Sequence, residues 1–72
     1  MNPRLLQIHP APWYYDECSN ARVIVKDSRG VTVYLEDFGG IPDEMQGSAA
    51  EEIREATKLI AAHLIDTANQ FA

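Results

Sequence analysis

Apolar and β-branched residues gather in short segments over the first half of the chain, and polar turn residues separate them. Residues 13–17, 22–26 and 31–36 are rich in aromatic or β-branched side chains, which is typical of strands. Residues 18–20 and 27–30 contain the Ser, Asn, Asp and Gly that favour turns. The pattern therefore predicts three consecutive strands in an antiparallel sheet.

The second and third segments predict a hairpin whose register follows from matching apolar residues. A three-residue loop over residues 28–30, a type I turn closed by a glycine with positive φ, pairs Val25 with Val33. The same register pairs Val23 with Leu35, whereas a two-residue loop would set apolar residues opposite polar ones. These four side chains are therefore the predicted core side of the sheet.

A helical pattern of apolar residues occupies the C-terminal third of the chain. Ser48 followed three residues later by Glu51 matches a capping box, which predicts that the helix begins at Ala49. At about 100° per residue, six side chains fall on one stripe, which is expected to cover the sheet. The stripe comprises Ile53, Ala56, Ile60, Leu64, Thr67 and Phe71. The predicted fold class is α+β, a small three-stranded antiparallel sheet packed against one C-terminal α-helix.

The segments outside these elements differ in character. Residues 1–11 contain Pro3 and Pro10, and a further proline follows, so this segment is expected to be an extended arm rather than a helix. Residues 12–72 then form a single domain, because a chain of 72 residues has room for only one core. Residues 37–47 connect sheet to helix, and Phe38 within them is a predicted hydrophobic anchor.

Composition narrows the class of protein. The hydrophobic content of 46% is typical of globular proteins, and no run approaches the roughly 20 apolar residues that a membrane span needs. A lone Cys18 rules out an internal disulfide and favours a reducing compartment, so a cytoplasmic location is expected.

The net charge of −5 is unevenly divided along the chain. Residues 1–35 carry four basic and three acidic residues, whereas residues 36–72 carry two basic and eight acidic ones. An acidic surface of this kind attracts basic partners and repels phosphate groups.

The residues that could take part in catalysis lack the additional motifs and spacings that an active site requires. Asp37-Phe38-Gly39 matches the magnesium-holding triplet of kinases, but the glycine-rich loop, strand lysine and catalytic loop of a kinase are missing. His9, His63 and Cys18 have no paired spacing typical of metal ligands. We therefore expect no enzyme activity, no catalytic residue, no metal and no cofactor.

The first candidate for binding is the acidic face of the predicted helix. Glu51 with Arg54, and Glu55 with Lys58, have the i, i+3 spacing of ion pairs on a helix. The remaining carboxylates would attract a protein with a basic surface. The predicted partner-binding residues are Glu51, Glu52, Glu55 and Asp66 on the helix and Asp43 and Glu44 in the preceding connection.

The second candidate is the outer face of the sheet, with Arg22 and Lys26 beside Ile24 and Tyr34. Aromatic platforms with basic neighbours stack single-stranded bases, so a nucleic-acid-binding domain is the alternative function. The net negative charge opposes it. A third interpretation is a homodimer whose interface hides Leu59, Ile65 or the pair Ile24 and Tyr34.

Three features together carry a family resemblance: Pro12-Trp13 opening a strand, a valine-rich hairpin, and the closing run Lys58-Leu59-Ile60-Ala61-Ala62. Over roughly residues 12–68 the chain resembles small uncharacterised proteins encoded by bacteriophages and prophages. Their helices often carry a proline where this chain has Leu64. The resemblance implies no catalytic residue. It implies a phage origin, where small acidic proteins commonly bind host proteins, including defence complexes such as CRISPR effectors.

Overall fold

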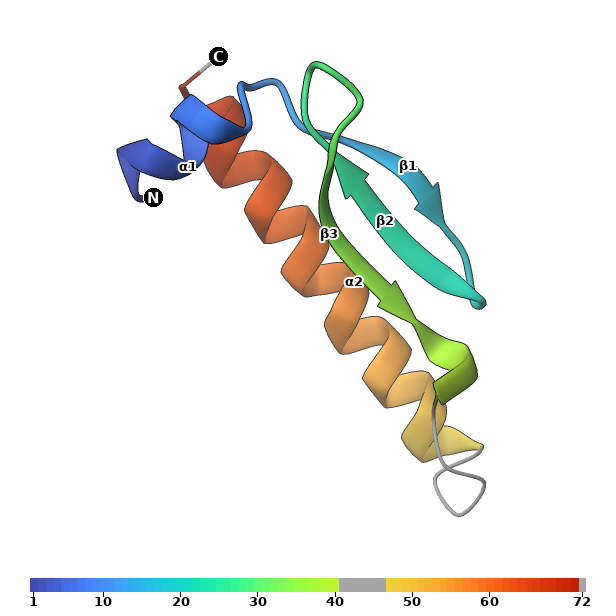
Figure 1. Cartoon of the computed structure of the whole chain (residues 1–72). Coiled ribbons are helices and arrows are strands. Elements are labelled where there is room, and N and C mark those ends of the chain that lie inside the picture. The colour runs from blue at the N-terminus through green and yellow to red at the C-terminus, as the bar shows by residue number, and fades with distance from the viewer. Residues whose placement is uncertain (41–46, 72) are drawn as a thin grey trace.

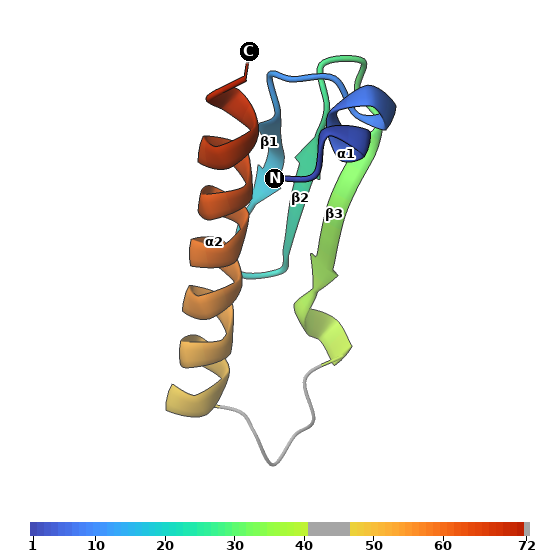
Figure 2. The ribbon, with the colours of Figure 1, turned by 90° about the vertical axis from the view of Figure 1, so that its left-hand side faces the viewer.

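The fold is α+β, as predicted: a three-stranded antiparallel sheet with one long helix packed along one face (Figures 1 and 2). The computed structural model describes residues 1–40 and 47–71. The strands follow the order β1-β2-β3. The elements in chain order are α1 (Pro3–Ile8), β1 (Tyr14–Cys18), β2 (Arg22–Lys26), β3 (Thr32–Asp37), the short 3-10 helix η1 (Phe38–Gly40) and α2 (Ser48–Asn69).

The N-terminal segment is a short helix, so the prediction of an extended arm over residues 1–11 is wrong. Asn2 caps α1 by accepting a hydrogen bond from the Arg4 amide at 2.8 Å. Pro3 occupies the first helical turn, where an amide would have no partner within the helix and its loss costs nothing. Proline at this position starts a helix, although it would break one farther along.

The predicted turn between β2 and β3 is confirmed. The Gly30 amide donates to the Asp27 carbonyl at 3.0 Å, and the Asp27 amide donates to the Val31 carbonyl at 2.9 Å. Gly30 has a φ of 82°, the left-handed conformation that the three-residue loop requires. The loop residues Ser28 and Arg29 thus bring the two strands together in the expected way.

Replacing Gly30 by valine is expected to destabilise the hairpin by about 2 kcal/mol, because a β-branched residue strongly resists positive φ. A side chain at this position would meet only the Tyr14 hydroxyl, at an ordinary contact distance of 3.8 Å, so the cost is backbone strain. Urea unfolding of Gly30→Val and Gly30→Asn measures it. Asparagine tolerates positive φ far better, and equal losses in the two variants would exclude backbone strain as the cause.

The predicted register holds only next to the turn. Lys26 pairs with Thr32, but a bulge follows, and beyond it Val25 pairs with Tyr34 and Ile24 with Leu35. Residues opposite one another in a ladder share a face, so Tyr34 lies with the core and Leu35 lies on the outer face, 54% exposed. The predicted core position of Leu35 is therefore wrong.

The core lies between β2 and α2 and is closed at its two ends by aromatic side chains. Its buried members are Trp13, Val23, Val25, Phe38, Ala61 and Ala68. Burial of Phe38 confirms the predicted hydrophobic anchor. The helix contributes small residues because they let its backbone approach the sheet closely.

The buried side of α2 is rotated away from the predicted stripe. Ala50, Thr57, Ala61 and Ala68 are the buried residues of the helix, whereas Ile60 is 51% exposed. The direction of the buried residues and the direction of the predicted stripe differ by about 60° around the helix axis. Ala56, Ile60 and Phe71 on the predicted stripe are exposed. The stripe therefore contacts the sheet only along one of its own edges.

The predicted capping box at the start of α2 does not form. The helix begins at Ser48, and Gly47 is its N-cap with no side-chain hydrogen bond. The Glu51 amide instead donates to the Gly47 carbonyl at 3.1 Å. The boundary agrees within one residue, but the chemistry of the cap differs from the prediction.

Candidate protein-binding face

The acidic face of α2, defined by Glu51, Glu52, Glu55 and Asp66, is exposed to solvent as predicted. These residues lie on the side of the helix away from the buried alanines. Asp43 and Glu44, the other two predicted partner-binding residues, fall outside the described residues. The described part of the predicted site therefore lies on one helix, with three glutamates near its start and Asp66 toward its end.

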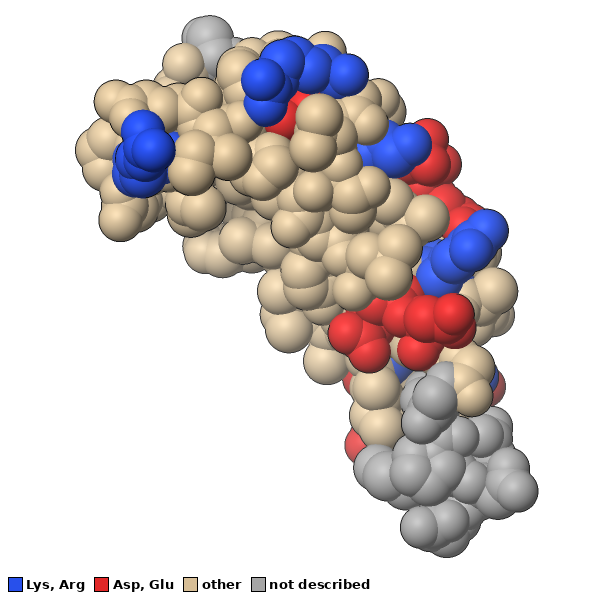
Figure 3. Space-filling model, viewed as in Figure 1, with Lys and Arg blue, Asp and Glu red and all other residues tan. Residues whose placement is uncertain are grey.

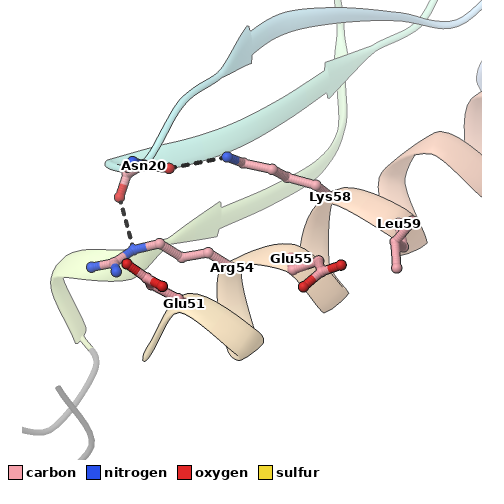
Figure 4. Close-up of a pocket in the computed structure, with 6 residues that line it drawn as sticks. All are labelled: Asn20, Glu51, Arg54, Glu55, Lys58 and Leu59. Carbon is pink, nitrogen blue, oxygen red and sulfur yellow. Dashed lines mark hydrogen bonds between the residues drawn. The ribbon is translucent and has the colours of Figure 1, made fainter. Parts of the chain in front are cut away.

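The basic residues of α2 do not pair with these carboxylates. Arg54 Nε donates to the Asn20 carbonyl at 3.2 Å, and Lys58 Nζ donates to Asn20 Oδ1 at 3.0 Å (Figure 4). Within the described ranges, no ion pair links Glu51 or Glu55 to either cation, so the predicted i, i+3 pairs are absent. Both cations are bound at the turn between β1 and β2, and the carboxylates of Glu51 and Glu55 are exposed to solvent.

The orientation of Arg54 and Lys58 is fixed by further contacts. The Arg54 guanidinium lies 5.8 Å from the centre of the buried Phe38 ring, a cation–π arrangement. Beside Lys58, the Tyr15 hydroxyl donates to the Lys58 backbone carbonyl at 3.4 Å. Both contacts tie this side of α2 to the sheet, so the acidic face cannot rotate inward.

A shallow pocket of about 380 Å³ opens beside the acidic face. Figure 4 shows Arg54 and Lys58 extending toward Asn20, with Glu55 and Leu59 on the helix farther from Asn20. Leu59, which is 64% exposed, supplies an apolar margin. The lining residues are Asn20, Glu51, Arg54, Glu55, Lys58 and Leu59. Asn20 and Leu59 are members that charge patterning along the sequence did not single out.

The alternative binding surface on the sheet is not assembled as predicted. Arg22 forms an ion pair with Glu17, and Lys26 forms one with Asp16 at 3.3 Å, so acids neutralise both cations. Tyr34 lies on the core face instead, because the extra residue at the bulge in β3 turns its side chain to that side of the sheet. Figure 3 shows basic and acidic side chains next to each other along this side of the molecule.

The aromatic residues on β1 and before it do not make up for this loss. Trp13 is buried in the core, and Ile24 is only 9% exposed. Tyr15 pairs with Val25, which places it on the face toward α2. Tyr14 pairs with Lys26 and therefore lies on the outer face, 44% exposed. Its neighbouring cation Lys26 is bound to Asp16, which weighs against base stacking on Tyr14.

A buried polar cluster that the sequence did not reveal lies at the other end of the sheet. The Asp27 side chain is fully buried, and its carboxylate accepts hydrogen bonds from the Arg29 amide at 2.8 Å and the Val31 amide at 3.0 Å. His9 Nδ1 lies 2.9 Å from its second oxygen. The Ser28 amide donates to the Pro10 carbonyl at 3.0 Å. The cluster joins the hairpin turn to the segment after α1.

The hydrogen bonds keep Asp27 ionised. Burial alone would raise the pKa of this carboxyl, but hydrogen bonds from His9, Val31 and Arg29 outweigh burial and lower the pKa from 3.8 to about 2. A carboxyl with a lowered pKa stabilises the folded state at neutral pH, and the contribution disappears on protonation.

This lowered pKa predicts a loss of stability in acid. The contribution of Asp27 to the free energy of unfolding is complete above the unfolded pKa of 3.8 and declines as the pH falls toward 2. Thermal melts of the parent and Asp27→Asn at pH 5 and pH 2.5 measure it. The parent is expected to lose more stability than the variant over this range, and equal losses would contradict the assignment.

A second polar contact holds the C-terminal end of α2 against the start of β1. Asn69 Oδ1 accepts a hydrogen bond from the Trp13 amide at 2.7 Å, and Asn69 Nδ2 donates to the Trp13 carbonyl at 3.1 Å. The Trp13 indole donates to the His9 carbonyl at 2.8 Å. Trp13 therefore links α2, the sheet and the N-terminal segment, and both ends of α2 are fixed.

Comparisons with known protein families, curated proteins and solved structures give no match to this chain. None of the described helices is long and apolar enough to span a membrane. In the same described ranges, no three His, Cys, Asp or Glu side chains converge as they would around a metal ion.

Proposed function

We propose that this chain is a small, non-enzymatic interaction protein of phage type that binds a host protein with a basic surface through the acidic face of α2. Binding would modulate or inhibit that host protein in the bacterial cytoplasm. Host defence complexes, CRISPR effectors among them, are the partner class that the resemblance to phage proteins suggests. No catalytic step is assigned to the chain.

One observation carries the proposal: Arg54 and Lys58 are bound to Asn20 instead of to their acidic neighbours. On an isolated helix with this spacing, the cations would pair with Glu51 and Glu55 and weaken the negative field. Holding them at the β1–β2 turn leaves those carboxylates available to a partner. Complementary charge of this kind raises association rates and selects among partners.

The pocket beside the face supports the same function. It places exposed Leu59 next to Glu55, so a partner's lysine or arginine could meet a carboxylate while its aliphatic stem covers the leucine. Arginine is enriched at protein interfaces, and its aliphatic stem can cover apolar surface while its charged end pairs with a carboxylate.

The test compares matched charge reversals in a capture experiment. Immobilised parent protein is expected to retain a host protein from bacterial lysate, and Glu51→Lys with Glu55→Lys is expected to lose at least about nine-tenths of it. The single variants Glu55→Lys and Glu36→Lys form the matched pair, because both residues are exposed and only Glu55 lies on the acidic face. Equal retention by the parent and the double variant would refute binding through this face.

A further inference from the structure

The N-terminal segment, residues 1–10, lies on the same face of the sheet as α2. Figure 2 shows α2 on the β1 side of this face and α1 over β3. Within α1 no residue is buried, and the half-buried Leu6 is the residue that packs against the core cluster. A helix of six residues is too short to be stable in water by itself, so α1 persists only while the segment is held in place.

The contacts that hold this segment converge on the hairpin turn between β2 and β3. The Ser28 amide donates to the Pro10 carbonyl at 3.0 Å, and the Arg29 guanidinium donates to the Ile8 carbonyl. Three consecutive residues of the segment thus meet three consecutive residues of the turn. The pairs are Ile8 with Arg29, His9 with Asp27 and Pro10 with Ser28.

The hairpin turn keeps its own hydrogen bonds without the segment. The Gly30 amide donates to the Asp27 carbonyl at 3.0 Å, and the Asp27 amide donates to the Val31 carbonyl at 2.9 Å. The Asp27 carboxylate also accepts hydrogen bonds from the Arg29 and Val31 amides. The turn is therefore closed by bonds within residues 27–31, and the segment is an addition to it.

The connection between the segment and β1 provides a hinge. Both backbone groups of Trp13 are bonded to the Asn69 side chain, so the chain is fixed to α2 from Trp13 onward. Residues 11–12 lie between that anchor and the attached segment. Rotation about residues 11–12 would therefore release the segment and leave the sheet on α2.

We propose that residues 1–10 form a latch that opens as one unit about residues 11–12 while the sheet and α2 stay folded. Because the three attached residues are consecutive and α1 cannot persist alone, the contacts break together and α1 unfolds. Opening uncovers the apolar side of β3, where Val33 and Tyr34 pack against the same core cluster as Leu6. The closed latch is thus the cover of this surface.

The latch does not depend on the proposed partner-binding face. The acidic face lies on the side of α2 away from the buried alanines, whereas the latch lies over β3 (Figure 2). Opening therefore adds an apolar surface to the chain and leaves the acidic face unchanged.

Native-state hydrogen exchange at low urea concentrations tests the latch. The His9 amide, the Ser28 amide and the Trp13 indole proton are bonded only in the closed state, whereas the Asp27 amide reports on the hairpin itself. The three latch protons are expected to share one opening constant, at least about tenfold larger than that of the Asp27 amide. Their dependence on urea should be smaller than that of the Asp27 amide but above zero, because opening exposes part of the surface.

The variant Ser28→Pro loosens the latch without weakening the turn. Proline removes the amide that binds the Pro10 carbonyl, and it suits the second position of a type I turn, which Ser28 occupies. Exchange of the His9 amide and the Trp13 indole proton is expected to become about tenfold faster, with no acceleration at Asp27. Ser28→Ala is the matched control, because it keeps the amide and should leave the latch closed.

Three results would overturn the latch. An opening constant shared by the latch protons and the Asp27 amide would mean that the segment leaves only on global unfolding. Exchange of the latch protons without any dependence on urea would mean that no surface is uncovered. Equal acceleration of the His9 and Asp27 amides in Ser28→Pro would mean that the segment and the hairpin open together.

Discussion

Replacing Asp27 by alanine is expected to lower the melting temperature by about 10 °C or more, the largest effect of any single polar residue described. The carboxylate is fully buried and accepts hydrogen bonds from the Arg29 and Val31 amides and from His9. Alanine would remove the acceptor of all three hydrogen bonds and leave a small cavity, a loss that a domain of this size cannot easily absorb. The hairpin turn would also lose the His9 contact, one of its connections to the segment after α1.

A matched control distinguishes the effect of losing the Asp27 cluster from the effect of removing a carboxylate at the surface. Asp16 is an exposed carboxylate that pairs with Lys26 at 3.3 Å, and exposed ion pairs contribute little to stability. Thermal melts of Asp27→Ala and Asp16→Ala are therefore expected to differ widely. Similar small shifts in both variants would mean that the Asp27 cluster is not a structural junction.

Replacing Val25 by aspartate is expected to abolish cooperative folding at room temperature. Val25 is fully buried at the centre of the sheet and belongs to the cluster that contains Trp13 and Ala61. A carboxylate there would have no partner in the core, and the cost would exceed what a 72-residue domain has in reserve. Far-UV circular dichroism with temperature measures the outcome.

The companion variant Leu35→Asp tests the register. Matching apolar residues in the sequence predicts that Leu35 shares the core face with Val25, whereas the bulge in β3 moves it to the outer face, 54% exposed. Leu35→Asp is therefore expected to melt cooperatively, near the parent temperature. Unfolding of both variants would support the register without a bulge, and a cooperative melt of Val25→Asp would refute the core assignment.

The parts of the fold that local chemistry dictates could be predicted from the sequence. Asp27 before the loop and Gly30 at its end leave few alternatives for its conformation, and the three strands follow from their β-branched and aromatic residues. Phe38 could be predicted as an anchor because it stands alone among polar and glycine residues.

The bulge and the helix rotation could not be predicted, for two related reasons. Residues 33–35 are Val, Tyr and Leu, which put large side chains on both faces of a strand, so the pattern does not distinguish a regular ladder from one with an extra residue. Along α2, large and small apolar residues lie on adjacent flanks, and packing against the sheet selects the alanines. Hydrophobicity alone favours the isoleucines.

The sequence predicts which carboxylates of the candidate site are exposed, but not how the cations beside them are held. The exposure of Glu51 and Glu55 followed from the helical pattern. The hydrogen bonds from Arg54 and Lys58 to Asn20 could not be predicted, because each cation is 34 or 38 positions from Asn20 in the sequence. The burial of Asp27 against His9 is likewise a long-range contact, across 18 positions.

The central claim is that the acidic face of α2, and not the sheet, binds the partner. The most direct test is a titration of the parent and of Glu51→Lys with Glu55→Lys against the captured host protein and against single-stranded DNA, each at two salt concentrations. The parent is expected to bind the host protein with an affinity that falls as salt rises, and the double variant to associate more slowly and bind more weakly. Tight, salt-sensitive binding of the parent to DNA, abolished by Arg22→Glu with Lys26→Glu, would contradict the claim.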